Sequence, residues 1–297
     1  MKAAKKKNNL FVIILAIILT AYVLSLVVPV LWGIFTSLKT SDNYDDNILG
    51  LPGGAPWNWA WNNYGYVIKN FETTVTNGKG QMFNVPFGDL MVNTLLYAGI
   101  GGLLITLTPF TVAYMTSRFD YFFSKIVYGI VLVTMALPII GSYPSEIQML
   151  KTLGLYDKIY GTWIQKINFL GVYYLLFYGI FKGMDKAFWE AAYIDGASEF
   201  TVMTRIIMPL AKNAFFTVFL IKFIELWNDY QNVYLYIPGH PTLAYGIYSF
   251  RTTTDYRLKS VPVQLSGCVL MVVPIVVLFL VFKDKLIGNL SAGGVKG

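Results

Sequence analysis

Long uncharged apolar runs recur along this chain, and they restrict the folds open to it more than any other feature. Each run is about 20 residues long, the length that an α-helix needs to cross the hydrocarbon core of a bilayer. A soluble core of this size would alternate apolar with polar positions. Charged residues make up 13% of the 297 residues, against about 25% in an ordinary soluble domain. The sequence therefore predicts an all-α polytopic membrane protein.

The apolar runs predict six transmembrane helices. They lie at about residues 10–38, 90–115, 122–140, 167–181, 214–237 and 261–282. The other segments are a long loop at 39–89, a polar segment at 183–213 and a tail at 283–297. Because no tandem repeat or low-complexity tract divides the chain, residues 1–297 are predicted to form a single transmembrane domain.

The basic residues predict which side of the membrane each segment faces. Lysines precede the first span at 2–7 and follow the last span at 283–296, and basic residues beside a span favour the cytoplasmic side. An even number of spans then places both termini in the cytoplasm. In this orientation the cytoplasmic segments hold thirteen Lys and Arg residues and the external ones nine. Loop 39–89 is expected outside and segment 183–213 inside.

Several function classes lack the residues that they need. Cys268 is the one cysteine and His240 the one histidine, so the sequence offers no disulfide, thiolate cluster or histidine-rich metal site. It contains no Walker A loop, Gly-x-Ser-x-Gly elbow or His-Glu-x-x-His motif. The basic residues form no stripe of the kind that binds nucleic acid. We expect neither enzymatic activity nor a cofactor, metal or nucleic acid bound by this chain.

The segment 190–209 is polar and helix-forming, although it separates two apolar spans. Glu190, Ala191 and Ala192 favour a helix, and Gly196 after Asp195 tolerates the left-handed backbone that ends one. A second short helix is predicted from Ser198, with Phe200, Val202, Met203, Ile206 and Ile207 as its apolar residues and Pro209 at its end. Two helices joined by a glycine turn form a surface suited to a cleft in a cytoplasmic partner.

This segment resembles the EAA loop of bacterial ABC-importer permeases. That pattern reads Glu-Ala-Ala, a glycine four residues later and Ile-x-Leu-Pro after nine more. The matching positions are Glu190, Ala191, Ala192, Asp195, Gly196, Ala197, Ile206 and Pro209, with Met208 in place of the usual leucine. Residues 63–64, 93–95, 113–119, 153–155 and 242–246 are similar to recurring segments of the carbohydrate branch. The tail at 291–297 resembles that of maltose-type permeases.

The resemblance implies a type I importer permease (MetI-like) fold in the bacterial cytoplasmic membrane. Such a subunit pairs with a second, homologous permease, sits on two cytoplasmic ATPases that bind ATP and Mg²⁺, and receives sugar from an external solute-binding protein. The EAA loop would then be the helix that couples to an ATPase. Glu190 would make the ionic contact, Gly196 the turn, and Phe200, Met203 and Ile206 the packing surface. The alternative is that Glu190 merely caps a solvated helix.

Three ionisable residues in the fifth predicted span leave a further choice open. Lys222, Glu225 and Asp229 are spaced to share one helix face, and ionisable groups at membrane depth usually pair or line a cavity. An internal ion pair is our preferred interpretation. A proton relay would instead make the chain a proton-coupled secondary transporter. Asn228 and Asp229 are also candidates for the sugar path, together with Tyr245 in the loop before the last span.

Overall fold

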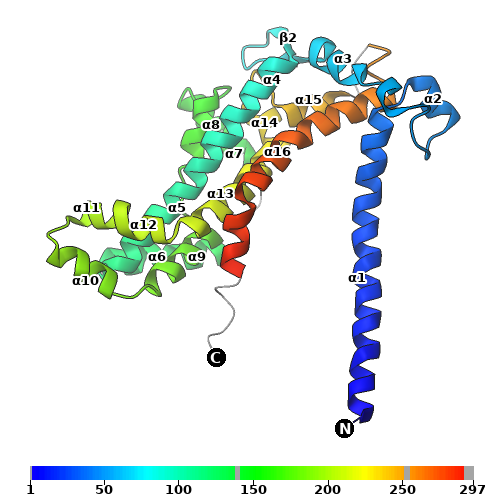
Figure 1. Ribbon diagram of the computed structural model, residues 1–297. Coiled ribbons are helices and arrows are strands. Elements are labelled where there is room, and N and C mark those ends of the chain that lie inside the picture. Colours follow the sequence, from blue (N-terminus) through cyan, green and yellow to red (C-terminus); the bar gives the residue numbers. More distant parts are fainter. Residues whose placement is uncertain (1, 138–140, 251–254, 291–297) are drawn as a thin grey trace. The chain divides into compact units, whose positions relative to one another are not determined.

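The computed structural model describes residues 2–137, 141–250 and 255–290 (Figure 1). The predicted tail at 291–297 and the end of the third predicted span, at 138–140, lie outside the described residues. The regular structure is almost entirely helical, which confirms the all-α class. The chain divides into two compact units, Met1–Phe71 with Ser249–Val272, and Glu72–Tyr248 with Val273–Gly297.

The first unit consists of a long helix and several short ones. Its elements are α1 (Lys2–Ser37), α2 (Ser41–Asp46), η1 (Pro56–Asn58), α3 (Asn62–Asn70) and the first part of α16 (Val261–Leu290). Within α1, Leu10–Ser37 has a mean hydropathy of 3.0, and its apolar side chains are exposed on all sides. A helix that is apolar all round and uncovered suits a lipid environment.

The end of α1 is held by buried polar groups. Asn63 donates its amide N–H groups to the carbonyl oxygens of Ser37 and Lys39, at 3.0 and 2.8 Å. The Lys39 ammonium is buried and donates to the carbonyls of Asn47 and Ile48, at 2.5 and 3.3 Å. These bonds satisfy carbonyls that a helix end leaves free. The predicted external loop therefore begins as an ordered structure.

The second unit contains the remaining elements. Its strands are β1 (Glu72–Thr76) and β2 (Met82–Pro86), an antiparallel hairpin in which Thr74 pairs with Asn84. Its helices are α4 (Phe87–Thr94), the π-helix η2 (Leu95–Ile100), α5 (Gly101–Arg118), α6 (Phe122–Ala136), α7 (Tyr143–Thr152), α8 (Ile159–Gln165), α9 (Val172–Lys182), α10 (Ala187–Ile194), α11 (Glu199–Thr201), the π-helix η3 (Val202–Ile207), α12 (Met208–Leu210), α13 (Lys212–Trp227), α14 (Gln231–Tyr236) and α15 (Leu243–Ser249).

The core of the second unit forms where α5 packs against α9 and α13. Phe110 of α5 meets the rings of Phe177, Phe181 and Phe215 edge-on, with centroids 4.9 to 5.1 Å apart. Edge-to-face pairs stabilise a core beyond the area they bury. A Cβ on Gly102 would lie 3.4 Å from the backbone nitrogen of Phe223. A glycine at this position therefore lets α5 and α13 approach closely.

Long apolar helices cover three of the six predicted spans. Among the described residues they are Leu10–Ser37, Phe87–Arg118 and Val261–Lys283. The shorter apolar helices α6 and α9 cover the third and fourth. Helix α13 covers most of the fifth, and it is bent by 72° from the preceding segment Glu199–Leu210. Within the described residues, each predicted span thus contains a helix over all or part of its length, and the six-span arrangement in a membrane stays a prediction.

The fifth predicted span ends earlier than the sequence suggests. Helix α13 stops at Trp227 because Asn228 leaves the α-helical conformation and its side-chain amide donates to the carbonyl of Ile224 at 2.8 Å. Asp229 then accepts the backbone N–H of Asn232 at 3.0 Å and so opens α14. The prediction that Lys222, Glu225 and Asp229 share one helix face is wrong, since Asp229 lies beyond the break.

Candidate functional site

The segment 187–210 folds as two helices joined by a glycine turn, as predicted. Helix α10 ends at Ile194, and Gly196 follows with a φ of +76°, a left-handed conformation that side chains other than glycine disfavour. The Ser198 hydroxyl accepts the backbone N–H of Thr201 at 3.3 Å and caps α11, the usual role of serine at a helix start. Local sequence chemistry therefore accounts for the glycine turn and for the helix cap.

The predicted contact residues of this segment divide into an outer and an inner set. Glu190, Ala191, Asp195, Gly196, Phe200 and Pro209 are exposed. Ala192 is buried, and Ala197, Met203 and Ile206 are half-buried and pack against the unit's own core. Met203 and Ile206 therefore fix the segment in place rather than project from it. The roles predicted for the outer set stay predictions.

Two large apolar side chains stand out from the segment. Ile194 is 86% exposed and Phe200 is 70% exposed, one on each side of the glycine turn. Together with the carboxylate of Glu190 they give the turn an apolar surface with an acidic edge. Side chains of this size exposed on an ordered polar segment are typical of a surface that a partner covers.

Arg118, at the end of α5, ties this segment to the core. Its guanidinium lies 5.7 Å from the ring centres of both Trp189 and Tyr193 and donates to the Tyr193 hydroxyl at 3.2 Å. That hydroxyl donates to Glu199 at 2.5 Å, and Glu199 lies 4.0 Å from Arg118. Burial, and then the bond to Glu199, raise the pKa of Tyr193. One residue of a long apolar helix thus contacts both helices of the segment.

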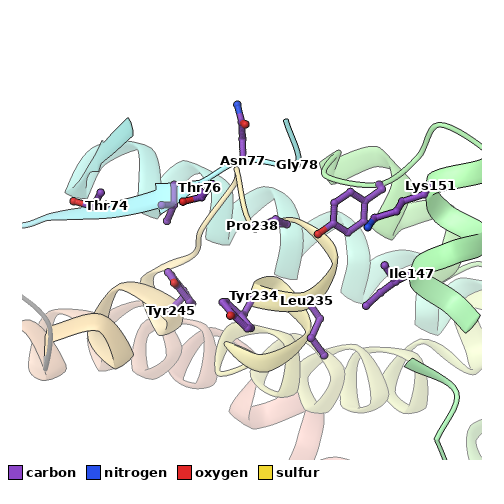
Figure 2. Close-up of a pocket in the computed structure, with 12 residues that line it drawn as sticks. Thr74, Thr76, Asn77, Gly78, Ile147, Lys151, Tyr234, Leu235, Pro238 and Tyr245 are labelled. Atoms are coloured by element: carbon purple, nitrogen blue, oxygen red, sulfur yellow. The ribbon is translucent and has the colours of Figure 1, made fainter. Parts of the chain in front are cut away.

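At the other end of the second unit, three loops surround an open cavity of about 570 Å³ (Figure 2). They come from the hairpin, from α7 with the turn that follows it, and from the α14–α15 region. The sequence predicts the first two and the loop after Ile237 to be external, whereas it assigns α14 to the fifth span. The stretch Phe87–Arg118 is 32 residues long, about 48 Å at about 1.5 Å per residue. It follows the hairpin at one end and reaches the Arg118 cluster at the other.

Asp157 joins two of the loops beside this cavity. Its two carboxylate oxygens accept the backbone N–H groups of Gly78 and Gly239, each at 2.6 Å. Its own N–H donates to the carbonyl of Tyr236 at 2.9 Å. A Cβ on Gly239 would lie 2.7 Å from the Asp157 carboxylate, so a residue without a side chain is needed there. A second bond set, from the Tyr236 hydroxyl and the Gln165 amide to Glu146, joins α14 to α7 and α8.

The predicted sugar-path residues do not form one site. Tyr245 lines the cavity, whereas Asp229 accepts the Tyr97 hydroxyl at 2.7 Å and the Asn232 amide at 2.9 Å. The Lys166 ammonium donates to the same Tyr97 hydroxyl at 3.3 Å. Asn228 is exposed and its amide is used by the helix end. Asp229 thus belongs to a polar cluster at the helix break.

Lys222 and Glu225 form a separate ion pair at 2.5 Å, one turn apart on α13. The Glu225 side chain is 52% exposed. The two residues pair with each other as our preferred interpretation expects, but with Glu225 half exposed the pair is not internal to this chain. The proton relay through three residues finds no support, since Asp229 makes its bonds elsewhere.

Sequence reasoning gave no role to several residues that organise these sites. Arg118 carried a usable signal, because it is a charged residue at the end of an apolar run. Ile194 also carried a usable sequence signal, since it is an apolar residue beside the predicted turn. Asp157, Tyr97 and Lys166 carried none, because their partners lie between 69 and 132 positions away in the sequence.

Residues 105–288 match the family described as "Binding-protein-dependent transport system inner membrane component". This stretch includes the two-helix segment, its Arg118 anchor and the last apolar helix. The chain belongs to this family. It is therefore an inner-membrane component of a transport system that depends on a binding protein, which agrees with the resemblance seen in the EAA loop.

Permease proteins of other organisms are similar to this chain over most of its length. The diacetylchitobiose uptake system permease protein NgcG of Streptomyces coelicolor is 22% identical over 98% of this chain and 91% of its own length. The probable starch degradation products transport system permease protein AmyC of Thermoanaerobacterium thermosulfurigenes is 26% identical over 92% of this chain and 95% of its own length. MelC of Bacillus subtilis, a melibiose/raffinose/stachyose import permease, is 26% identical over 71% of this chain and 76% of its own length.

A solved structure shares the fold. A chain of a bacterial ABC transporter involved in alginate import aligns with a TM-score of 0.75, at 21% identity, over 94% of this chain and 97% of that one. The type I importer permease fold predicted from the sequence is confirmed.

Proposed function

We propose that this permease is one half of the membrane path of an ABC importer for an oligosaccharide. The observation that carries the proposal is the exposed helix–glycine–helix segment, with Glu190, Ile194 and Phe200 on its outer surface and Arg118 holding it to α5. The family membership supports the transport role. The sugar class is supported by relatives whose names refer to diacetylchitobiose, starch products and raffinose-type sugars.

In this function the segment seats in a cleft of a cytoplasmic ATPase. Glu190 pairs with a basic residue there, and Ile194 and Phe200 are buried in the contact. When ATP with Mg²⁺ closes the ATPase pair, the segment moves with its partner. Arg118 transmits that movement to α5 because it contacts both helices of the segment. The spans then rotate as rigid bodies, a hinge type of transition.

The other subunits of the transporter follow from the same proposal. A second permease of the same fold completes the path, and two ATPases bind the nucleotide. The chain sits in the bacterial cytoplasmic membrane with both termini inside. In this orientation the cavity of Figure 2 faces outward, and a solute-binding protein delivers sugar on that side.

Co-purification from detergent tests the proposal. The wild-type chain is compared with a Glu190→Lys, Gly196→Pro double variant, and bound proteins are identified by mass. We expect a P-loop ATPase and a second permease with the wild type, and loss of the ATPase from the double variant. Glu72→Lys, an exposed glutamate on β1, is the matched control and should keep both partners. Recovery of the wild-type chain without an ATPase would overturn the proposal.

A further inference from the structure

The cavity at the external end of the second unit combines aromatic rings with a particular pattern of charge. Among the twelve residues that line it there is one lysine and there is no aspartate or glutamate. Asp157, which lies next to it, has both carboxylate oxygens occupied by backbone N–H groups. Lys151 is therefore the one charged side chain in the lining of this cavity, and the Asp157 carboxylate beside it keeps its negative charge. Its volume falls in the range of small-molecule sites, roughly 300–1,000 Å³.

Tyrosine rings form a strip that starts in the cavity and continues out of it. The rings of Tyr234 and Tyr245 are within 9° of parallel, with centroids 6.0 Å apart. Tyr248 follows at 6.3 Å from Tyr245, and Tyr230 stacks on Tyr248 at 4.6 Å. Tyr234 is 59% exposed and Tyr248 is 53% exposed. An amphipathic ring offers an apolar face and a hydroxyl, which suits a ligand with C–H faces and hydroxyl edges.

Hydrogen-bonding groups lie opposite the tyrosines. Thr74 and Thr76 are exposed on the same face of β1. The Thr74 hydroxyl donates to the Asn84 side chain at 2.8 Å and can still accept a hydrogen bond, whereas a threonine hydroxyl such as that of Thr76 can both donate and accept. The Lys151 ammonium lies 4.9 Å above the Tyr156 ring, which places a cation beside the cavity. Figure 2 shows Thr74 and Thr76 on the strand β1, and Tyr234 and Tyr245 on the helices α14 and α15 on the other side of the space. A polar ring entering the cavity would find stacking on one side and hydroxyl partners on the other.

We propose that this cavity and strip are an external docking subsite for an oligosaccharide. This inference rests on the proposed sugar-importing function and deepens it. Tyr234 and Tyr245 stack the first sugar ring, and Tyr248 and Tyr230 carry the rings that follow. Lys151 gives a preference for sugars that bear a carboxylate, because it is the charged residue that lines the cavity. The four-ring strip suits a chain of several sugars better than a single one.

Binding without the solute-binding protein tests the subsite. The full chain, with whatever subunits co-purify, is placed in lipid nanodiscs and titrated with maltohexaose and with an oligogalacturonate of equal length, using saturation-transfer NMR. We expect both to bind and the oligogalacturonate to bind at least fivefold more tightly. Tyr234→Ala should lower the affinity for each oligosaccharide at least fivefold, whereas Tyr234→Phe should keep the wild-type affinities. Lys151→Gln should make the affinities for the two oligosaccharides equal. Tyr160→Ala, an exposed tyrosine on α8, is the matched control.

The outcomes separate this inference from the proposed function. Lack of saccharide binding to the wild type, or equal binding by wild type and Tyr234→Ala, overturns the subsite even when the ATPase co-purifies. Equal affinity of the wild type for the two oligosaccharides overturns the role of Lys151. If Tyr234→Ala instead weakens capture of the solute-binding protein and leaves saccharide binding unchanged, the surface recognises protein and the inference is wrong. Loss of ATPase co-purification with saccharide binding intact would count against the importer and leave the subsite standing.

Discussion

The carboxylate of Asp157 accepts the backbone N–H of Gly239 at 2.6 Å across 82 positions of sequence. Its second oxygen does the same for Gly78 of the hairpin turn. Asp157 itself has a φ of 58°, a left-handed conformation that is unfavourable for residues other than glycine, although aspartate adopts it more readily than most. One side chain therefore holds the hairpin and the α14–α15 loop in the arrangement that surrounds the cavity.

Asp157→Ala is expected to loosen both loops. Each lost hydrogen bond to a charged acceptor is worth about 2 kcal/mol, and solvent access reduces that figure. Hydrogen exchange should rise at Gly78 and Gly239 and stay unchanged in α9. Asp42→Ala, an exposed aspartate of α2, is the control and should leave exchange at these glycines unaltered. Unchanged protection in the Asp157 variant would show that other contacts hold the loops.

Gly196→Ala is expected to impair coupling to the ATPase. Alanine at a φ of +76° costs about 1–2 kcal/mol, so the turn should relax and displace Ile194 from its exposed position. The measurement is sugar-stimulated ATP hydrolysis by the purified complex, which should fall severalfold. The matched control is Gly179→Ala, since a Cβ there meets nothing within 4 Å on a regular helix. Full stimulation in the Gly196 variant would show that the left-handed turn is dispensable.

Arg118→Lys is expected to uncouple the segment while keeping the charge. Lysine cannot stack its head group over Trp189 and Tyr193 as a planar guanidinium does. The complex should still assemble, but transport per ATP hydrolysed should drop. The control is Arg205→Lys, an exposed arginine of the same segment. Equal transport efficiency in the two variants would mean that Arg118 does not transmit the movement.

Asp229→Ala and Glu225→Gln are expected to behave differently. Removing Asp229 leaves the buried Tyr97 hydroxyl and the Asn232 amide without this acceptor, and an unsatisfied buried polar group costs about 1–3 kcal/mol. Glu225 belongs to a half-exposed pair, worth at most about 1 kcal/mol. The temperature of thermal unfolding and the rate of sugar uptake should both fall for Asp229→Ala and remain near wild type for Glu225→Gln. The opposite ranking would reinstate Glu225 as a proton-carrying group.

Glu146 is expected to make the external loops sensitive to acid. Hydrogen bonds from Ser142 and then Tyr236 lower the pKa of Glu146. Its contribution to stability is therefore complete above the unfolded pKa, about 4.3, and is lost as the pH falls through the lower folded pKa. Proteolysis between α7 and α8 should accelerate as the pH drops from about 5 to about 3. In the Glu146→Gln variant the rate of proteolysis should change less with pH. A pH dependence as steep as that of the wild type would assign the acid sensitivity to other groups.

The sequence determined the features that depend on neighbouring residues. Apolar runs of span length predicted the helices, because a bilayer requires each backbone group to be bonded within its own helix. The two-helix segment was also predictable, since Ser198, Gly196 and Pro209 act through capping, left-handed backbone and helix termination. These effects work within a few residues, so they can be read along the chain.

The tertiary structure decided which distant residues meet. Nothing near Asp157 in the sequence points to Gly239, and nothing near Arg118 points to Tyr193, 75 positions away. The break at Asn228 has local causes, because the Asn228 amide donates to the Ile224 carbonyl and Asp229 accepts the Asn232 N–H. Only the folded chain shows that Asp229 also accepts the hydroxyl of Tyr97, 132 positions away. The positions of the helices follow from local chemistry, and the cavity and the Arg118 anchor follow from contacts that only the folded chain brings together.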